Sequence, residues 1–173
     1  MLSLVSDVIY ISIMKAFFTG HRDIVNIKDG INQLIDIAWE RGVTEFMNGM
    51  ALGVDQEAAE ILIERELNWT AVIPCQNQDR LWSPQQKLKY QELLKSASNK
   101  IVLYPEYTPG VMQARDIWMV KHSDICLAVY DGRLTGGAAL TVNLAIAHNL
   151  PVIQFNPRTL ETAVIEPRQL SLF

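Results

Sequence analysis

The stretch Asp131-Gly-Arg-Leu-Thr-Gly-Gly-Ala-Ala-Leu-Thr141 decides the expected fold of this chain. It follows the apolar run Ile125 to Tyr130 and leads into a helix-like segment that ends near Asn149. Glycines in such a turn allow sharp backbone bends and let a ligand lie against free amides at the start of a helix. The partial positive charge of a helix start favours phosphate or carboxylate groups. The turn therefore predicts an anion site between a strand and a helix.

Two earlier turns have the same setting. The segment TGHR at 19–22 follows an apolar run, and the segment NGMALGVD at 48–55 follows another. Each of them precedes a segment with the apolar spacing of an amphipathic helix. Because ligands of open α/β sheets bind beyond the carboxyl ends of the strands, we expect the three turns to converge on one ligand.

Apolar periodicity predicts strands that alternate with helices along the whole chain. Ser83-Pro84 is a strong helix start, because Ser caps well and Pro loses nothing at the first helical position. This alternation predicts a single Rossmann-like α/β domain with a mostly parallel sheet and helices on both faces. The expected strands cover 16–19, 43–47, 70–74, 101–104, 125–130 and 152–155, and the expected helices cover about 27–41, 54–67, 84–97, 112–122 and 141–149.

Length and composition agree with one domain. The chain has 173 residues, of which 49% are hydrophobic, and a domain of this size buries roughly 70% of its unfolded surface. We expect an N-terminal extension at 1–13, the domain at 14–157 and a C-terminal tail at 158–173. The net charge of −4 argues against binding nucleic acid mainly through phosphate neutralisation.

The N-terminal stretch lacks a basic region and a cleavage pattern, and it is too short to span a bilayer. We therefore expect a cytoplasmic protein with no membrane segment. Cys75 and Cys126 lie in apolar runs at no metal-ligand spacing, so they are predicted to be buried free thiols. No metal site is expected.

Five motifs in order resemble the YpsA-like family of the SLOG superfamily. This superfamily takes in DprA-type DNA-processing proteins and LOG-type phosphoribohydrolases. The resemblance covers roughly Met14 to Asn156 and implies a Rossmann-like domain that binds nucleotides or nucleotide derivatives. The motifs are Thr19-Gly-His-Arg22, Gly49-Met-Ala-Leu-Gly53-Val-Asp55, Ile73-Pro-Cys-Gln-Asn-Gln78 with Trp82, Met112-x-x-Arg115-x-x-x-Met119 with Ser123-Asp124, and Asp131-Gly-x-x-x-Gly-Gly137 with Thr141.

The turns and the resemblance together indicate the ligand-binding residues. An Arg beside a helix start suits a phosphate through paired hydrogen bonds. Asp55 either contacts the ligand or caps the second helix, and Trp82 either stacks on a base or packs in the core. We expect a nucleotide-derived ligand and no required cofactor. The candidates are Gly20, His21, Arg22, Gly49, Leu52, Gly53, Asp55, Gln78, Asp131, Gly132, Gly136, Gly137 and Thr141.

Arg115 is the candidate catalytic residue. LOG enzymes carry a similar Met-x-x-Arg and pair this Arg with a Glu after the glycines to cleave an N-glycosidic bond. Here Asn143 stands at the Glu position, and an amide cannot act as a general base. Glu57, Glu60 and Asp131 are possible substitutes, and spacing selects none of them. Ala138 also replaces the Thr that is usual in YpsA-like relatives.

These departures favour a binding protein for an ADP-ribose-like ligand or a nucleoside phosphate, which senses or sequesters it. The alternatives are a LOG-like nucleotide N-glycosidase and a DprA-like DNA-processing factor. SLOG relatives commonly form oligomers, so the resemblance implies a homo-oligomer.

The chain ends in Gln169-Leu-Ser-Leu-Phe173, which resembles the peptide by which bacterial proteins bind the sliding clamp. In that reading a Gln orients the peptide, and apolar side chains fill a pocket. The alternative is that the segment packs on its own domain. The residues that would contact the clamp are Gln169, Leu170, Leu172 and Phe173.

Overall fold

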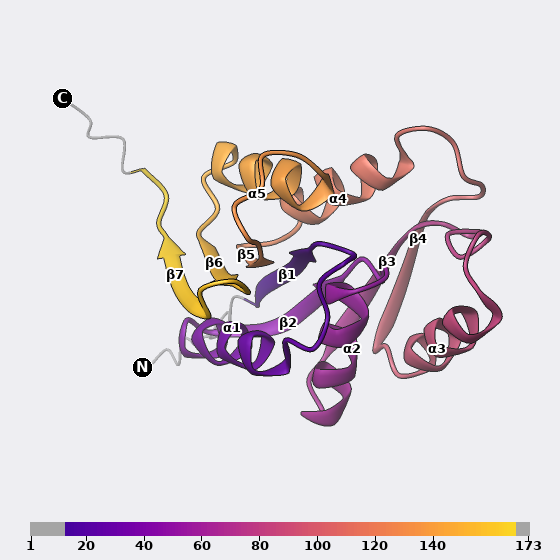
Figure 1. Cartoon of the computed structure of the whole chain (residues 1–173), viewed down its shortest axis with the longest axis horizontal. Coiled ribbons are helices and arrows are strands. Elements are labelled where there is room, and N and C mark those ends of the chain that lie inside the picture. The colour runs from indigo at the N-terminus through magenta and orange to yellow at the C-terminus, as the bar shows by residue number, and fades with distance from the viewer. Residues whose placement is uncertain (1–12, 169–173) are drawn as a thin grey trace, which may run out of the picture.

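The apolar runs of the sequence form a seven-stranded sheet (Figure 1). The computed structural model describes residues 13–168. The strands are β1 (Met14–Gly20), β2 (Val43–Asn48), β3 (Trp69–Cys75), β4 (Asn99–Tyr104), β5 (Ile125–Val129), β6 (Val152–Asn156) and β7 (Glu161–Ile165). The helices are α1 (Lys28–Glu40), α2 (Val54–Glu64), α3 (Pro84–Lys95), α4 (Val111–Lys121) and α5 (Gly137–Ala147).

The strand order places a switch point at β1. The order is β4-β3-β2-β1-β5-β6-β7, and all neighbours are parallel except β6 and β7. The chain runs outward from β1 to β4 and then returns to place β5 on the other side of β1. The helices that follow β1 and β5 therefore leave on opposite faces, which opens a crevice at the carboxyl ends of these two strands.

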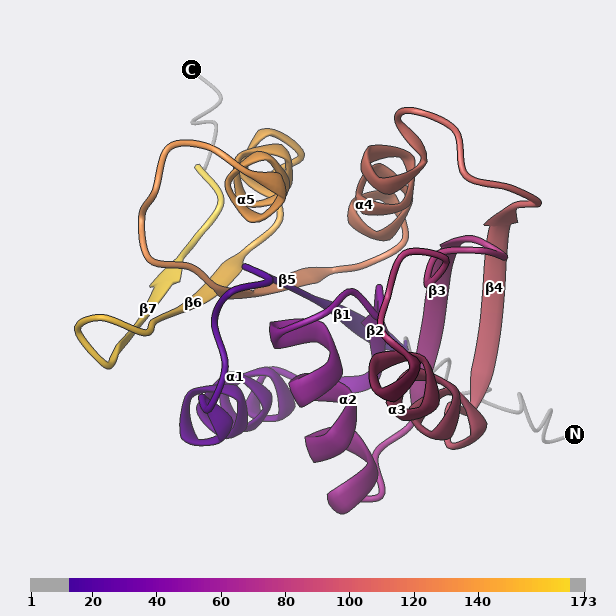
Figure 2. The same ribbon diagram turned by 45° about the vertical axis from the view of Figure 1, so that its right-hand side comes forward.

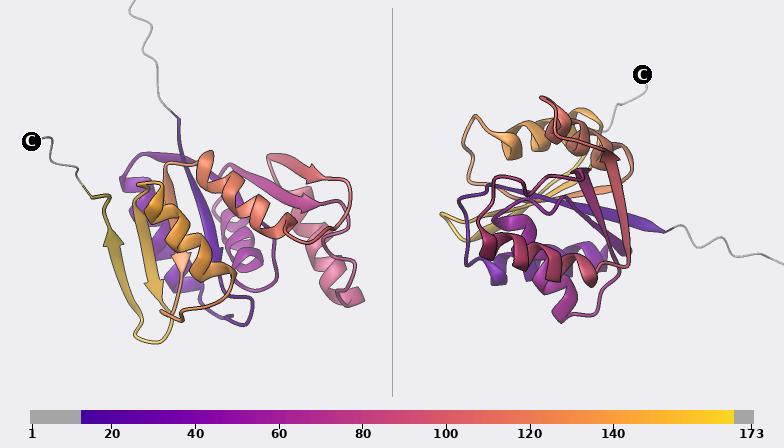
Figure 3. Two further views of the ribbon diagram at one scale, coloured as in Figure 1. Left: turned by 90° about the horizontal axis from the view of Figure 1, so that it is seen from above. Right: turned by 90° about the vertical axis from the view of Figure 1, so that its right-hand side faces the viewer.

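The sheet is covered on both faces. Helices α1, α2 and α3 lie on one face, and α4 and α5 lie on the other (Figure 2 and Figure 3). Phe17 and Phe18 are successive residues of β1 that belong to the two different cores, because alternate side chains of a strand point to opposite faces. Strand β5 is accordingly buried and apolar along its whole length, as is typical of buried parallel strands.

The predicted fold class is confirmed, and so are several local predictions. The Ser83 hydroxyl accepts the Gln86 amide at 3.3 Å, and the Gln86 side chain accepts the Ser83 amide at 2.9 Å, so a capping box starts α3. Cys75 and Cys126 are buried free cysteines. Helix α5 begins at Gly137 rather than near Thr141, because the turn residue Gly136 already serves as its N-cap.

Strand β7 was not predicted. It pairs antiparallel with β6 at the sheet edge, inside the segment expected to be a tail. Thr162 and Val164 favour a strand, but most of this short segment is exposed, so its apolar pattern is weak. The predicted extension up to residue 12 and the peptide Gln169 to Phe173 lie outside the described residues. Within residues 13–168, no helix combines the length and apolarity that a membrane span requires.

The contact between α1 and β6 leads to a stability prediction. A Cβ atom at Gly30 would lie 2.4 Å from the buried Phe155 ring. We expect Gly30→Ala to lower the free energy of unfolding by about 1–3 kcal/mol, despite a helix-propensity gain of about 1 kcal/mol. Gly137→Ala is the matched control, because a Cβ atom there meets nothing within 4 Å. Urea denaturation measures both, and an unchanged midpoint for Gly30→Ala would contradict the close contact.

Candidate functional site

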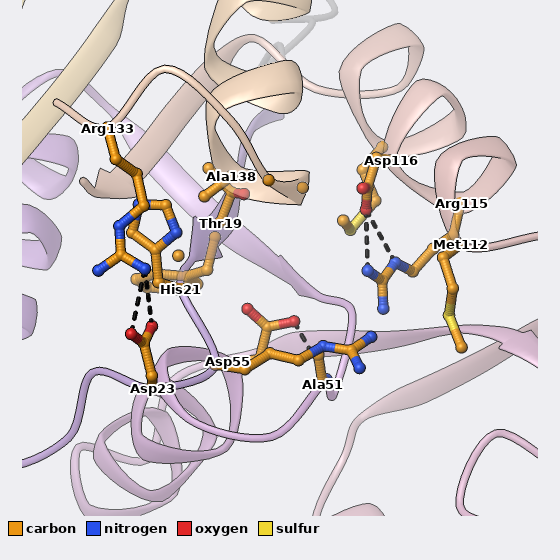
Figure 4. A pocket seen from close by; sticks show the side chains of 16 residues that line it. Thr19, His21, Asp23, Ala51, Asp55, Met112, Arg115, Asp116, Arg133 and Ala138 are labelled. Atoms are coloured by element: carbon orange, nitrogen blue, oxygen red, sulfur yellow. Dashed lines mark hydrogen bonds and ion pairs between the residues drawn. The ribbon is translucent and has the colours of Figure 1, made fainter. Parts of the chain in front are cut away.

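A polar pocket lies at the switch point of the sheet (Figure 4). It has a volume of about 330 Å³. Its walls come from the end of β1, the start of α2, one face of α4, the glycine-rich turn and the start of α5. The lining residues are Phe18, Thr19, Gly20, His21, Arg22, Asp23, Ala51, Asp55, Met112, Arg115, Asp116, Met119, Arg133, Gly136, Gly137 and Ala138.

The start of α5 presents backbone amides to this pocket. Gly136 has φ 103° and ψ 168°, a backbone conformation that side chains other than glycine rarely adopt. No side chain in the described chain caps this helix, and its first turn carries no acidic residue. Gly137 and Ala138 follow directly and line the pocket. The first amides of α5 are therefore free to bind an anion.

Arg115 forms the floor of the pocket. Its buried guanidinium donates from Nη1 to the Gly49 carbonyl at 2.8 Å and from Nε to Asp116 Oδ1 at 3.0 Å. A Cβ atom at Gly49 would lie 2.7 Å from Nη1, so the glycine is needed for this approach. The guanidinium thus joins α4 to the loop after β2.

Arg133 stands on the opposite side, in the glycine-rich turn. Its Nη1 lies 3.1 Å from both carboxylate oxygens of Asp23, and its Nη2 lies 2.8 Å from Asp131 Oδ2. Arg158 donates to the same Asp131 oxygen from Nη2 at 2.9 Å. The hydrogen bonds from Arg133, followed by those from Arg158, hold the pKa of Asp131 well below its ordinary value. Asp131 is therefore a buried anchor for two arginines.

His21 lies between this anchor and the pocket. Its Nε2 is 3.4 Å from Asp131 Oδ1 without hydrogen-bond geometry, and its ring packs on Tyr130 at a centroid distance of 5.6 Å. Burial lowers the pKa of His21 below its ordinary 6.5, and the positive charge of Arg133 lowers it further. His21 is therefore neutral at pH 7.

Two carboxylates accompany Arg115 in the pocket. Asp55 is 5% exposed and accepts the Ala51 amide at 3.1 Å. Burial raises its pKa to about 6, although the nearby Arg115 charge acts in the opposite direction. Asp116 accepts hydrogen bonds from Arg115 and from the Thr141 hydroxyl, the latter at 3.2 Å. Figure 4 shows Asp55 between the Arg133–Asp23 pair and the Arg115–Asp116 pair.

The structure divides the sequence-predicted site residues into two groups. The first group lines the pocket and consists of Gly20, His21, Arg22, Asp55, Arg115, Gly136 and Gly137. The second group does not line it and consists of Gly49, Leu52, Gly53, Gln78, Asp131, Gly132 and Thr141.

Several residues of the second group support the loops around the pocket. Gln78 donates to the carbonyls of Gly49 and Met50 at 3.2 and 3.0 Å. Gly53 has φ 82° and is the N-cap of α2, so Asp55 is not that cap. A Cβ atom at Gly53 would lie 2.6 Å from the Arg22 carbonyl oxygen. These residues shape the site without reaching its interior.

The sequence prediction missed Asp116 and Arg133. Met112, Arg115, Asp116 and Met119 all line the pocket, and their spacing places them on one face of α4. That helical spacing is the signal that would have added Asp116 to the motif. Arg133 is the basic residue inside the glycine-rich turn itself.

Two positions departed from the patterns of related proteins: Ala138 from the YpsA-like pattern and Asn143 from the LOG pattern. Ala138 lines the pocket, whereas Asn143 is exposed and does not. Of the suggested substitute carboxylates, Glu57 accepts the Ile27 amide at 2.7 Å and Glu60 pairs with Lys89 at 2.8 Å. Neither belongs to the pocket lining. Residues 13–168 contain no cluster of His, Cys, Asp and Glu side chains suited to a metal ion.

A parallel sheet with a polar pocket at its switch point defines the Rossmann-like α/β class. The chain belongs to the YspA SLOG family, whose YpsA model matches residues 12–153. The family resemblance inferred from the motifs is thereby confirmed.

Three known proteins are similar to this chain. YoqJ, an uncharacterized SPbeta prophage-derived protein of Bacillus subtilis (strain 168), is 30% identical over 65% of this chain and 76% of its own length. DNA processing protein A (DprA) from Streptococcus pneumoniae has a TM-score of 0.61 and 16% identity, over 82% of this chain and 50% of DprA. The molybdenum cofactor carrier protein of Chlamydomonas reinhardtii has a TM-score of 0.55 and 22% identity, over 83% of this chain and 76% of the carrier.

The likenesses to the two solved structures establish the fold alone. The chain spans half the length of the pneumococcal DprA.

The raised pKa of Asp55 predicts a pH-dependent stability. The pKa of the Asp55 carboxyl is about 6 in the folded chain, whereas its ordinary value is 3.8. The folded chain therefore binds this proton more tightly than the unfolded chain does. The resulting stabilisation is complete below pH 3.8 and is lost as the pH rises through 6. We expect the free energy of unfolding of Asp55→Asn to rise by about 3 kcal/mol relative to that of the wild-type chain over this pH range. Urea unfolding at a series of pH values measures the difference, and a constant difference would contradict the prediction.

Proposed function

We propose that this protein binds a nucleotide or a nucleotide derivative in the pocket at the carboxyl ends of the strands. The observation that carries the proposal is that Arg22, Arg115 and Arg133 line the same pocket as the start of α5, which no side chain of the described residues caps. Free amides and guanidinium groups are the donors that recognise phosphate oxygens. ADP-ribose-like ligands and nucleoside phosphates both carry such groups.

The ion pairs of the pocket indicate that a ligand can replace the outer partner of Arg133. Arg115, in contrast, stays paired with a largely buried carboxylate. Arg115 is buried against Asp116, whereas the side chain of Asp23 is 66% exposed where it pairs with Arg133. An exposed ion pair contributes little to stability, because water screens the two charges. A phosphate can therefore replace Asp23 as the partner of Arg133 at little cost, while Asp131 keeps the guanidinium in place.

The similar proteins support binding in general terms. One is named as a carrier of the molybdenum cofactor and another as a DNA-processing protein. Both names are consistent with a pocket or surface that receives phosphate groups. We therefore infer that sensing or sequestering a ligand is the role that this pocket serves best.

A matched pair of arginines tests the proposal. Arg133 and Arg158 both bind Asp131, but only Arg133 lines the pocket. We expect Arg133→Gln to weaken the binding of ADP-ribose or a nucleoside monophosphate about tenfold or more, because a charged hydrogen bond to phosphate is lost. Arg158→Gln should change the affinity less than about twofold.

Isothermal titration calorimetry with ADP-ribose, nucleoside monophosphates and a short single-stranded DNA measures these affinities. Equal losses in the two variants would assign the effect to Asp131 rather than to a ligand contact. The absence of binding for the whole panel would reject the proposed function, and binding of the DNA alone would favour the DNA-processing alternative.

A second candidate function, nucleotide N-glycosidase, is favoured by the position of Asp116. This carboxylate lies in the pocket beside Arg115 and supplies the negative charge that Asn143 lacks. In the reaction the bond between C1′ of the ribose and the base nitrogen breaks. Water adds its hydroxyl to C1′, and its proton goes to the base. A carboxylate stabilises the positive charge that develops on the sugar.

The enzymatic candidate predicts that wild-type protein releases free base from nucleoside monophosphates. Asp116→Asn should slow the release about a hundredfold or more, because the amide carries no charge and cannot accept a proton. Chromatography of the free base measures the rate, with Glu60→Gln outside the pocket as the control. No release from any of the four common ribonucleoside monophosphates would exclude this candidate.

A further inference from the structure

A second hollow adjoins the polar pocket. It is the α4–α5 groove, with a volume of about 510 Å³, which we define by Ile117, Leu140 and Leu144 together with Gln113 and Thr141. The groove and the pocket share four lining residues, namely Met112, Asp116, Gly136 and Gly137. The two hollows therefore adjoin at the start of α5.

The walls of the groove are apolar, in contrast to the pocket. Ile117 is 39% exposed and Leu140 is 60% exposed, although both are large aliphatic side chains. Aliphatic side chains that remain exposed beside a polar site gain free energy when an apolar group covers them. A ligand that has a polar end and a flat apolar end fits the two hollows together.

Gly137 lies where the two hollows adjoin. Its φ lies outside the left-handed region, and an added Cβ atom would meet nothing within 4 Å. Neither backbone strain nor packing within the described residues therefore requires a glycine at this position. Gly137 lines both hollows, and no described residue occupies the space that its Cβ atom would enter.

Asp116 lies at the boundary between the pocket and the groove. Its oxygens accept hydrogen bonds from Arg115 and Thr141, and a carboxylate has about four acceptor positions. The remaining positions suit hydroxyl donors of a sugar. From the pocket to the groove, the protein thus offers free amides, then a hydroxyl acceptor and then apolar side chains. These groups suit the phosphate, the ribose and the base of a nucleotide, in the same order.

We propose that the α4–α5 groove holds the base of a nucleoside phosphate whose phosphate lies at the start of α5. This inference rests on the proposed function and names the place of the base. It predicts that the base contributes affinity through the groove and that ribose 5-phosphate, which lacks a base, gains nothing from it.

The test compares adenosine monophosphate with ribose 5-phosphate by calorimetry. In the wild-type chain we expect adenosine monophosphate to bind about tenfold or more tightly than ribose 5-phosphate. Leu140→Gln should remove most of this ratio and change the affinity for ribose 5-phosphate less than about twofold. Both residues of this substitution are neutral, and Leu140 is exposed, so neither the charge of the site nor the core is altered.

Ile146→Gln is the matched control. Ile146 is an exposed aliphatic residue of the same helix that does not line the groove, so the ratio should stay at its wild-type value. An unchanged ratio in Leu140→Gln, or equal affinities of the two ligands in the wild-type chain, would overturn the groove assignment while the phosphate site stands. Binding of neither ligand nor of ADP-ribose would reject the proposed function as well. Dimers that dissociate in Leu140→Gln while the ratio persists would show that a second copy covers the groove.

Discussion

The buried guanidinium of Arg115 is the constraint on which the site depends. A charge in this position requires compensation, since removing it from water costs several kcal/mol unless hydrogen bonds and an opposite charge replace the solvent. Asp116 and the Gly49 carbonyl provide these partners. The same contacts fix α4 against the loop after β2. The hydrogen bonds that compensate the buried charge therefore also set the shape of the pocket floor.

Asp131 has the corresponding role on the other wall. It is buried under Arg133 and Arg158, and it lies beside the neutral ring of His21. The ion pairs of Asp131 with Arg133 and Arg158 hold the glycine-rich turn in a defined position. Arg133, which enters the pocket, is thus fixed by the buried carboxylate of Asp131. Its other partner, Asp23, is exposed and replaceable.

Much of the fold could be predicted because parallel strands buried on both faces leave continuous apolar runs. Ser83 and Pro84 marked a helix start through the chemistry of capping, and the glycine-rich turn marked the start of α5. Strand β7 escaped prediction because an exposed edge strand needs little apolar surface. In the site, Gly136 and Arg115 were found from turn chemistry and motif resemblance. Asp116 was missed, although its helical spacing from Met112 and Met119 was present.

The sequence by itself determined the alternation of strands and helices from β1 to β6, the positions of the glycine turns and the family. These features follow from local backbone preferences and from periodicity, which act over a few residues. The tertiary structure alone decided which polar side chains enter the pocket. Asp131 and Gln78 are buried supports, whereas Asp116 and Arg133 face the ligand space, because these roles depend on contacts between distant segments. The α4–α5 groove beside the pocket likewise arises only when the two helices pack side by side on the sheet.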